Sequence, residues 1–277
     1  MSGNSTNTLS SLATPTPNKA STIYLIRHGD RYDYANKDWK EKILLCGGLY
    51  VDPPLSPIGH EQARETAIKL KDVKVDAILA SPYLRTIQTA VPFAEQKGLP
   101  IALEHGLAEV HHIPDILPDA SNRYLYFPHI DTNYISMAMP MASKEKIHEY
   151  YNKPQEVYPD GYFERIVRFS EVLQNRGFGK TVFCFSHAAS VALVAALLKC
   201  NFEDIPGDDN CIINDRTDLF APLGVYTLTR HGNGPWKLIT NGSTNKHLSR
   251  TDPNTFAWGH SEKSCDSWRK FYRVLTL

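Results

Sequence analysis

The first chemically suggestive cluster in the sequence is Arg27-His28-Gly29-Asp30-Arg31, which directly follows the apolar run 22–26. That run has the β-branched and aromatic composition of a buried strand. Arginine guanidinium groups match the oxygens of phosphate, and a neutral histidine can attack phosphorus. The cluster therefore predicts a phosphate-handling site with a nucleophile at a strand end, where open α/β sheets bind ligands.

Strand and helix patterns alternate along the rest of the chain. Further strands are predicted at 76–80, 101–103 and 181–185, with an edge hairpin near 225–229 and 236–240. Helices are predicted over about 57–71, 83–97 and 162–176, and after His187 to about residue 199. This alternation is typical of an α/β fold, here a three-layer αβα sandwich with a mostly parallel central sheet.

Three of the predicted strands end in side chains that could meet around one ligand. Arg27 and His28 follow the first strand, the segment 81–85 follows the second, and His187 follows the fourth. Since the carboxyl ends of parallel strands converge at one sheet edge, we expect these groups to form one site.

Composition and charge exclude several classes of partner. The 277 residues carry a formal net charge of +0, so no global field would attract nucleic acid or an anionic membrane. No segment is apolar enough to span a bilayer, and residues 1–21 lack the apolar run of a signal peptide. We interpret 1–21 as a flexible tail and 22–277 as a single domain. The five cysteines, without CxxC spacing, favour a reduced, cytoplasmic protein.

The segment 110–160 has no clear periodicity and is rich in aromatic residues, proline and histidine. Such a long irregular stretch is often a lid or a substrate loop, and this one is interpreted as an insertion that walls the pocket. Its aromatic side chains could accept an apolar leaving group, as in a phosphotyrosine-type protein or a phosphorylated small molecule. His111, His112, Asp115 and His129 could form a zinc cluster, but their spacing fits no standard pattern and adjacent histidines usually diverge. No metal or other cofactor is expected.

A series of short motifs spans roughly residues 22–200. They are Arg27-His28-Gly29, Leu55-Ser56-x-x-Gly59-x-x-Gln62-Ala63, Ala80-Ser81-Pro82-x-x-Arg85-x-x-x-Thr89-Ala90, Glu109 and Phe185-Ser186-His187. In this order they resemble the histidine phosphatase superfamily, also called phosphoglycerate-mutase-like. Asp30-Arg31-x-Asp33 and Asp52-Pro53-Pro54 are similar, more narrowly, to the branch that includes the Sts proteins and ecdysteroid-phosphate phosphatase.

The resemblance implies a metal-independent phosphomonoesterase that works through a phosphohistidine. His28 would be the nucleophile, and Glu109 would act as general acid and then as base, with Glu104 as a neighbouring competitor. The arginines would also disfavour imidazolium and so keep His28 neutral. The phosphoryl oxygens would be bound by Arg27, Arg31, Arg85 and His187.

One position departs from the family pattern. Many relatives carry glycine after the second histidine, whereas Ala188 stands there in this chain. Alanine is small enough for the start of the helix to approach phosphate, and Ser186 and Ser190 could donate extra hydrogen bonds.

Two other functions stay open. A phosphoglycerate-mutase-type phosphotransferase would hold the phosphoryl group on histidine until a second substrate takes it, although Arg31 after Asp30 resembles the phosphatases more. A non-catalytic module would bind phospho-ligands without turnover, although no catalytic group is missing. Aromatic residues in 256–272 could anchor the terminal segment to its own domain or form a homodimer interface.

Overall fold

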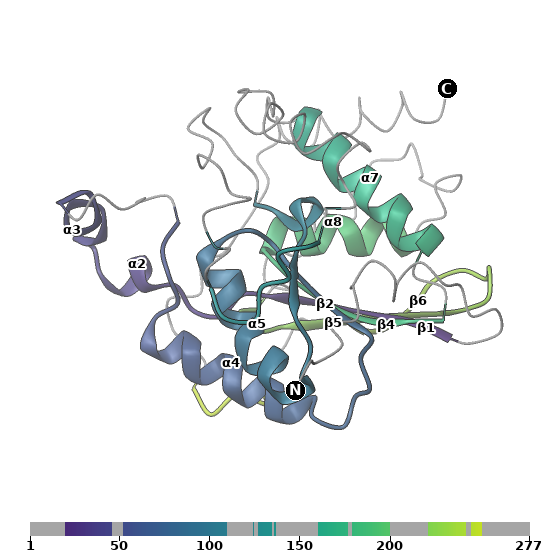
Figure 1. Ribbon diagram of the computed structural model, residues 1–277, viewed down its shortest axis with the longest axis horizontal. Coiled ribbons are helices and arrows are strands. Elements are labelled where there is room, and N and C mark those ends of the chain that lie inside the picture. The colour runs from purple at the N-terminus through teal and green to yellow at the C-terminus, as the bar shows by residue number, and fades with distance from the viewer. Residues whose placement is uncertain are drawn as a thin grey trace.

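The computed structural model of the chain is drawn in Figure 1. It describes residues 20–45, 52–109, 124, 127–134, 136, 160–176, 179–199, 221–241 and 245–250. The interpretations of residues 1–19, of 256–272 and of most of 110–160 lie outside these ranges.

Strands of the described residues form one sheet with the order β3-β2-β4-β1-β5-β6. Their bounds are β1 Ala20–Arg27, β2 Ala77–Ala80, β3 Ile101–Leu103, β4 Thr181–Ser186, β5 Val225–His231 and β6 Lys237–Asn241. The pairs β2–β3, β2–β4 and β1–β4 are parallel, whereas β5 is antiparallel to both β1 and β6. The sheet is therefore mostly parallel with an antiparallel hairpin at one edge, as predicted.

Helices cover both faces of this sheet (Figure 1). They are α4 (Pro57–Lys69) and α5 (Leu84–Lys97) on one face, and α7 (Asp160–Arg176) and α8 (Ala188–Lys199) on the other. Side chains alternate along β1, so Ile23 and Leu25 pack with α7 and α8 while Ile26 packs with α4 and α5. These two apolar layers confirm the three-layer αβα sandwich.

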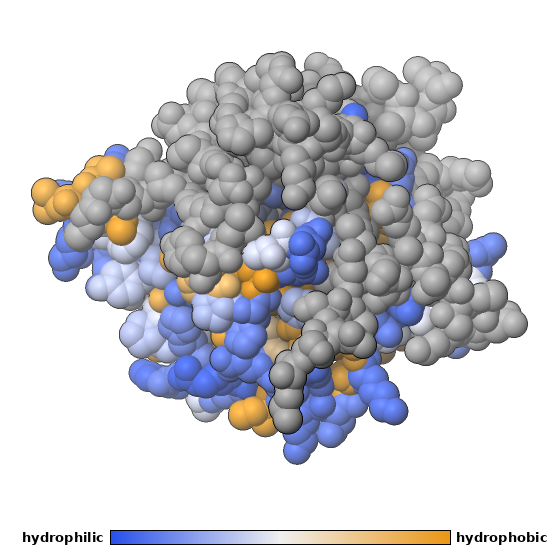
Figure 2. All heavy atoms as spheres, in the orientation of Figure 1, coloured by the Kyte–Doolittle hydropathy of each residue, from blue (hydrophilic) through white to orange (hydrophobic). Residues whose placement is uncertain are grey.

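Three shorter elements lie between the main ones. They are α2 (Tyr32–Ala35), α3 (Trp39–Leu45) and the 3-10 helix η1 (His105–Leu107). Leu44 and Leu45 are exposed at the end of α3, where Figure 2 shows apolar atoms at the left of the molecule. None of the helices in the described ranges is long and apolar enough to cross a membrane.

The first strand starts earlier than the sequence pattern indicated. β1 begins at Ala20 because Ala20 and Ser21 pair with His231 and Arg230 of β5. The last two residues of the segment expected to be a flexible tail therefore belong to the sheet. The other predicted strands and helices also have bounds within two residues of the prediction, whereas α2, α3 and η1 were not predicted.

The start of α4 packs directly against the loop that leaves β1. The Ser56 hydroxyl accepts a hydrogen bond from the Gly59 N–H at 3.0 Å, which makes Ser56 the N-cap residue that its place before Pro57 predicted. A Cβ atom on Gly59 would lie 2.3 Å from the carbonyl oxygen of Asp30. Glycine is therefore required here by the close approach of two backbones.

Replacing Gly59 with alanine should lower the free energy of unfolding by about 1–3 kcal/mol, because overpacking against backbone outweighs the better helix propensity of alanine. Urea unfolding measures this change. Glu61→Ala is the matched control, since Glu61 lies exposed on the same helix and should change stability by less than about 0.5 kcal/mol. Equal stabilities of the two variants would contradict the close approach.

Candidate active site

His28 occupies the first position after β1, at the carboxyl edge of the sheet. Its backbone N–H donates to the Ser186 carbonyl at 2.9 Å, which continues the β1–β4 pairing one residue further. Its ring Nδ1 lies 2.7 Å from the Gly29 carbonyl oxygen. Since a carbonyl can only accept, Nδ1 carries the proton and Nε2 is left with a lone pair.

The surroundings of His28 keep its ring neutral. Burial lowers the pKa of His28 well below the usual range, and Arg85, His187 and Arg27 lower it further. The hydrogen bond to Gly29 acts in the opposite direction. A neutral imidazole with an available Nε2 lone pair is a competent nucleophile.

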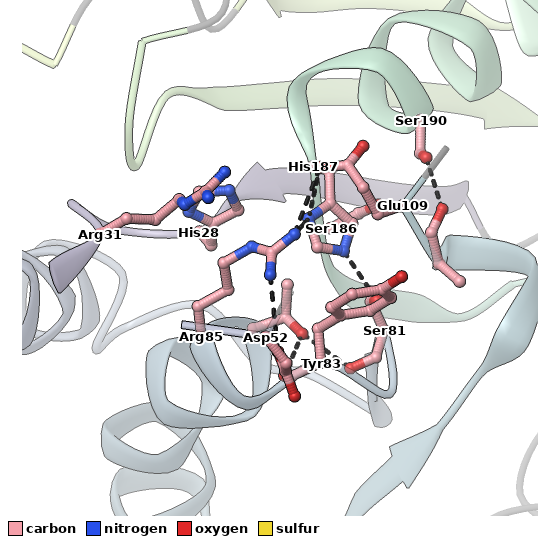
Figure 3. Close-up of polar contacts among 12 residues, drawn as sticks. His28, Arg31, Asp52, Ser81, Tyr83, Arg85, Glu109, Ser186, His187 and Ser190 are labelled. Carbon is pink, nitrogen blue, oxygen red and sulfur yellow. Dashed lines mark hydrogen bonds and ion pairs between the residues drawn. The ribbon is translucent and has the colours of Figure 1, made fainter. Parts of the chain in front are cut away.

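Arg85, from the first turn of α5, contacts carboxylates on two sides (Figure 3). Its Nη1 lies 3.5 Å from Asp52 Oδ1, and its Nη2 lies 3.3 Å from Glu109 Oε2 and 3.1 Å from His187 Nδ1. Asp52 also accepts from the Leu84 N–H at the start of the same helix and from the Tyr124 hydroxyl. The guanidinium is thus fixed in a buried position by charge-assisted contacts.

His187 follows β4 and stands beside His28, with ring centroids 5.3 Å apart. Its Nδ1 lies 3.2 Å from Glu109 Oε2, and its Nε2 lies 2.8 Å from the Ser81 hydroxyl. A hydroxyl both donates and accepts, so Ser81 can serve either neutral tautomer of His187. Burial lowers the pKa of His187 to about 4, against the opposing effect of Glu109.

The other two arginines predicted for the site also lie near it. Arg27 is buried at the end of β1, and burial lowers its pKa. Arg31 lies beside His28 in Figure 3, and its positive charge contributes to lowering the pKa values of Arg27 and His187. The structure thus brings all six predicted site residues to one sheet edge: Arg27, His28, Arg31, Arg85, Glu109 and His187.

Two glutamates follow β3, and they have different partners. Glu104 is fully buried and accepts from the Gly106 N–H, the Tyr134 hydroxyl and the Ser136 hydroxyl. Glu109 instead meets His187 and Arg85, with about a quarter of its side chain exposed. Burial alone would raise the pKa of Glu109, but His187, Arg85 and His28 together hold it well below the usual range.

The backbone that carries Glu109 is held by side chains from α7, β4 and α8. Arg165 donates to the carbonyls of His105 at 2.7 Å, Ala108 at 3.3 Å and Glu109 at 3.2 Å. Ser186 donates to the Leu107 carbonyl and Ser190 to the Ala108 carbonyl. The two serines thus donate hydrogen bonds, as the sequence suggested, and their acceptors are backbone carbonyls of the loop that carries Glu109.

Asp52, Ser81 and Arg165 are parts of the site to which the sequence interpretation gave no role. Asp52 and Ser81 stand within the quoted motifs, and Ser81 also directly follows the second predicted strand. Within the described ranges no group of three His, Cys, Asp or Glu side chains is arranged to hold a metal ion. Of the zinc candidates, only His129 is among the described residues, and it is exposed.

The buried histidines should make the fold sensitive to acid. Burial lowers the pKa of His105 to about 3, and Arg165 adds to the effect. The unfolded chain binds protons at such histidines from about pH 6.5 downward, whereas the folded chain does not. The free energy of unfolding should therefore fall as the pH drops from about 7 to about 4, and His105→Gln should flatten this slope by roughly 1 kcal/mol per pH unit.

Urea unfolding at a series of pH values measures the slope. His231→Gln is the matched control, because His231 is exposed at the end of β5 and its replacement should leave the slope as in the wild type. A wild-type slope in His105→Gln would mean that His105 is not held neutral in the folded protein.

Part of the chain matches a known protein family. Residues 23–114, which include His28, Arg85 and Glu109, match the model of the histidine phosphatase superfamily (branch 1). Phosphoserine phosphatase 1 of Hydrogenobacter thermophilus is 27% identical over 187 residues, covering 64% of this chain and 75% of that protein. Ubiquitin-associated and SH3 domain-containing protein A of Mus musculus is 34% identical over 116 residues, but the match spans 31% of this chain and only 19% of the mouse protein.

The fold has a solved counterpart. The ecdysone phosphate phosphatase from Bombix mori, in complex with tungstate, superposes with a TM-score of 0.55 at 21% identity, over 79% of this chain and 92% of that one. The family match therefore covers five of the six residues gathered at the sheet edge, all but His187, and the fold is of the same kind as that of the ecdysone phosphate phosphatase.

Proposed function

We propose that the protein is a metal-independent phosphomonoesterase that forms a phosphohistidine on His28. The observation that carries the proposal is the state of this ring, whose Nδ1–H donates to Gly29 while burial and nearby cations keep it neutral. Nε2 can therefore attack without a general base. The arginines supply the positive charge that a transferring phosphoryl group requires.

The reaction would proceed in two displacements. In the first, His28 Nε2 forms a P–N bond while the ester P–O bond breaks and the leaving oxygen departs. In the second, water attacks the phosphorus, the P–N bond breaks, and neutral His28 is restored. Arg27, Arg31 and Arg85 would stabilise the charge spread over the phosphoryl oxygens in both steps.

Glu109 would handle the proton in each step. Its low pKa makes it a carboxylate in the free protein, which suits the base that activates water in the second displacement. To act as the acid in the first, it must gain a proton when substrate binds. The negative phosphoryl group would offset Arg85 and raise the pKa of the carboxyl, and the proton can come from a monoanionic phosphate ester.

For the substrate, we propose a phosphotyrosine-type protein or a phosphorylated small molecule with an apolar leaving group. The similarity of Asp30-Arg31-x-Asp33 to the branch that includes the Sts proteins supports this choice. A panel of phosphotyrosine peptides, sugar phosphates and nucleotides would rule it out if the sugar phosphates were hydrolysed best.

Hydrolysis of p-nitrophenyl phosphate in EDTA should be readily measurable for the wild type. His28→Ala should lose at least about a thousandfold in kcat, because the nucleophile is gone. His231→Ala, at an exposed histidine far along the chain, is the matched control and should retain wild-type turnover.

Turnover that persists in His28→Ala would refute the phosphohistidine route. Wild-type exchange of phosphate between phosphoglycerates, with little free phosphate released, would instead identify a mutase. Loss of activity in EDTA that added metal restores would contradict a metal-independent reaction.

Replacing Glu109 with glutamine should lower the rate for some substrates more than for others, according to whether the leaving group needs a proton. An alkyl phosphate needs a proton on its departing oxygen, so its turnover should fall roughly 100-fold or more. The single-turnover release of p-nitrophenolate should fall far less, because this anion departs without a proton. Rapid-quench measurements on both substrates test this, and equal losses would show that Glu109 does not act as the acid.

A further inference from the structure

Arg31 is held by two side chains that follow it in the sequence. Its Nε donates to Asp33 Oδ1 at 3.0 Å and its Nη2 to Asp33 Oδ2 at 2.6 Å, a two-point contact with one carboxylate. Its Nη1 donates to the Tyr34 hydroxyl at 2.9 Å, and its Cζ lies 4.3 Å from the centre of the Tyr34 ring. The guanidinium is thus hydrogen-bonded along two of its edges and contacts an aromatic ring on one face.

The backbone around Arg31 is fixed as well. Arg31 forms an isolated antiparallel bridge with Leu55, and the Tyr32 N–H donates to the Pro54 carbonyl at 3.0 Å. Arg31 itself is the extended residue directly before α2, so Asp33 and Tyr34 lie in the first turn of that helix. This local geometry allows the side chain of Arg31 to fold back on residues two and three positions away.

The held guanidinium still has hydrogen-bonding capacity. An arginine has five N–H groups, and the contacts above use one on Nε, one on Nη2 and one on Nη1. Within the described part of the chain, this leaves one N–H on each terminal nitrogen. Such N–H groups are the donors that arginine offers to phosphate oxygens.

We propose that Asp33 and Tyr34 are positioning residues that preset Arg31 for a phosphoryl group, with the Tyr34 hydroxyl fixing the direction of Nη1. The proposal deepens the proposed function and rests on it, because Arg31 must contact phosphate. An arginine that is already ordered loses less conformational entropy when it binds phosphate. The affinity for phosphate is therefore higher. Burial raises the pKa of Tyr34 despite the nearby arginines, so its phenol stays protonated at neutral pH and accepts from Arg31 as a neutral group.

The test is a double-mutant cycle read by binding of inorganic phosphate in isothermal titration calorimetry. The proteins are the wild type, Tyr34→Phe, Arg31→Ala and the variant with both changes. Tyr34→Phe should raise the Kd about threefold to tenfold, as expected for one side chain that must now be ordered on binding. In the Arg31→Ala background the same change should have no further effect.

Tyr32→Phe is the matched control. Tyr32 lies on the same short helix, and its ring packs against Trp39, with centroids 5.6 Å apart. This variant should bind phosphate as the wild type does. Thermal unfolding of every variant shows whether an effect on binding reflects a general loss of structure.

Each other outcome has a distinct meaning. An equal loss of affinity in both Arg31 backgrounds, or no loss in Tyr34→Phe, would overturn the positioning role. Phosphate binding by a wild type that does not hydrolyse esters would defeat the proposed function while leaving this cycle fully readable. A wild type that binds no phosphate would overturn both, since Arg31 would then have no phosphoryl group to contact.

Discussion

The parallel pairing of β1 with β4 is the constraint on which the site depends. It sets Arg27 opposite Ser186, so His28 and His187 leave neighbouring strands at the same sheet edge. Side chains alternate between the two faces of a strand, so a shift of register by one residue would separate the histidines. The pairing of β2 with β4 then adds Ser81, and the helix that follows adds Arg85. The strand pairings that form the sheet therefore also bring the site residues together.

The elements of the fold were largely predictable because their signals are local. The apolar run 181–185 identified β4, and Ser56 before Pro57 marked the start of α4. The start of β1 could not be found in this way. Ala20 and Ser21 are ordered by pairing with β5, which lies about two hundred residues away in the sequence, and no pattern in 1–21 reports that partner.

The site residues also fall into two groups: those that local signals predicted and those that depend on long-range contacts. Strand ends placed Arg27, His28 and His187, since convergence of parallel strands is a general rule. The resemblance favoured Glu109 over Glu104, and the structure adds that the two carboxylates have different partners. The contacts of Arg165 with the 105–109 backbone were unpredictable, since they depend on how α7 packs.

The guanidinium groups of Arg31 and Arg85 already face carboxylates before any ligand arrives. Because these charges are paired and the formal net charge is +0, the electrostatic field outside the site should be weak. An anionic substrate would therefore meet the protein by ordinary diffusion rather than by electrostatic steering, and association should depend weakly on ionic strength. Discrimination would arise at contact distance, where a phosphoryl group has to fit the N–H groups that the resident carboxylates leave available.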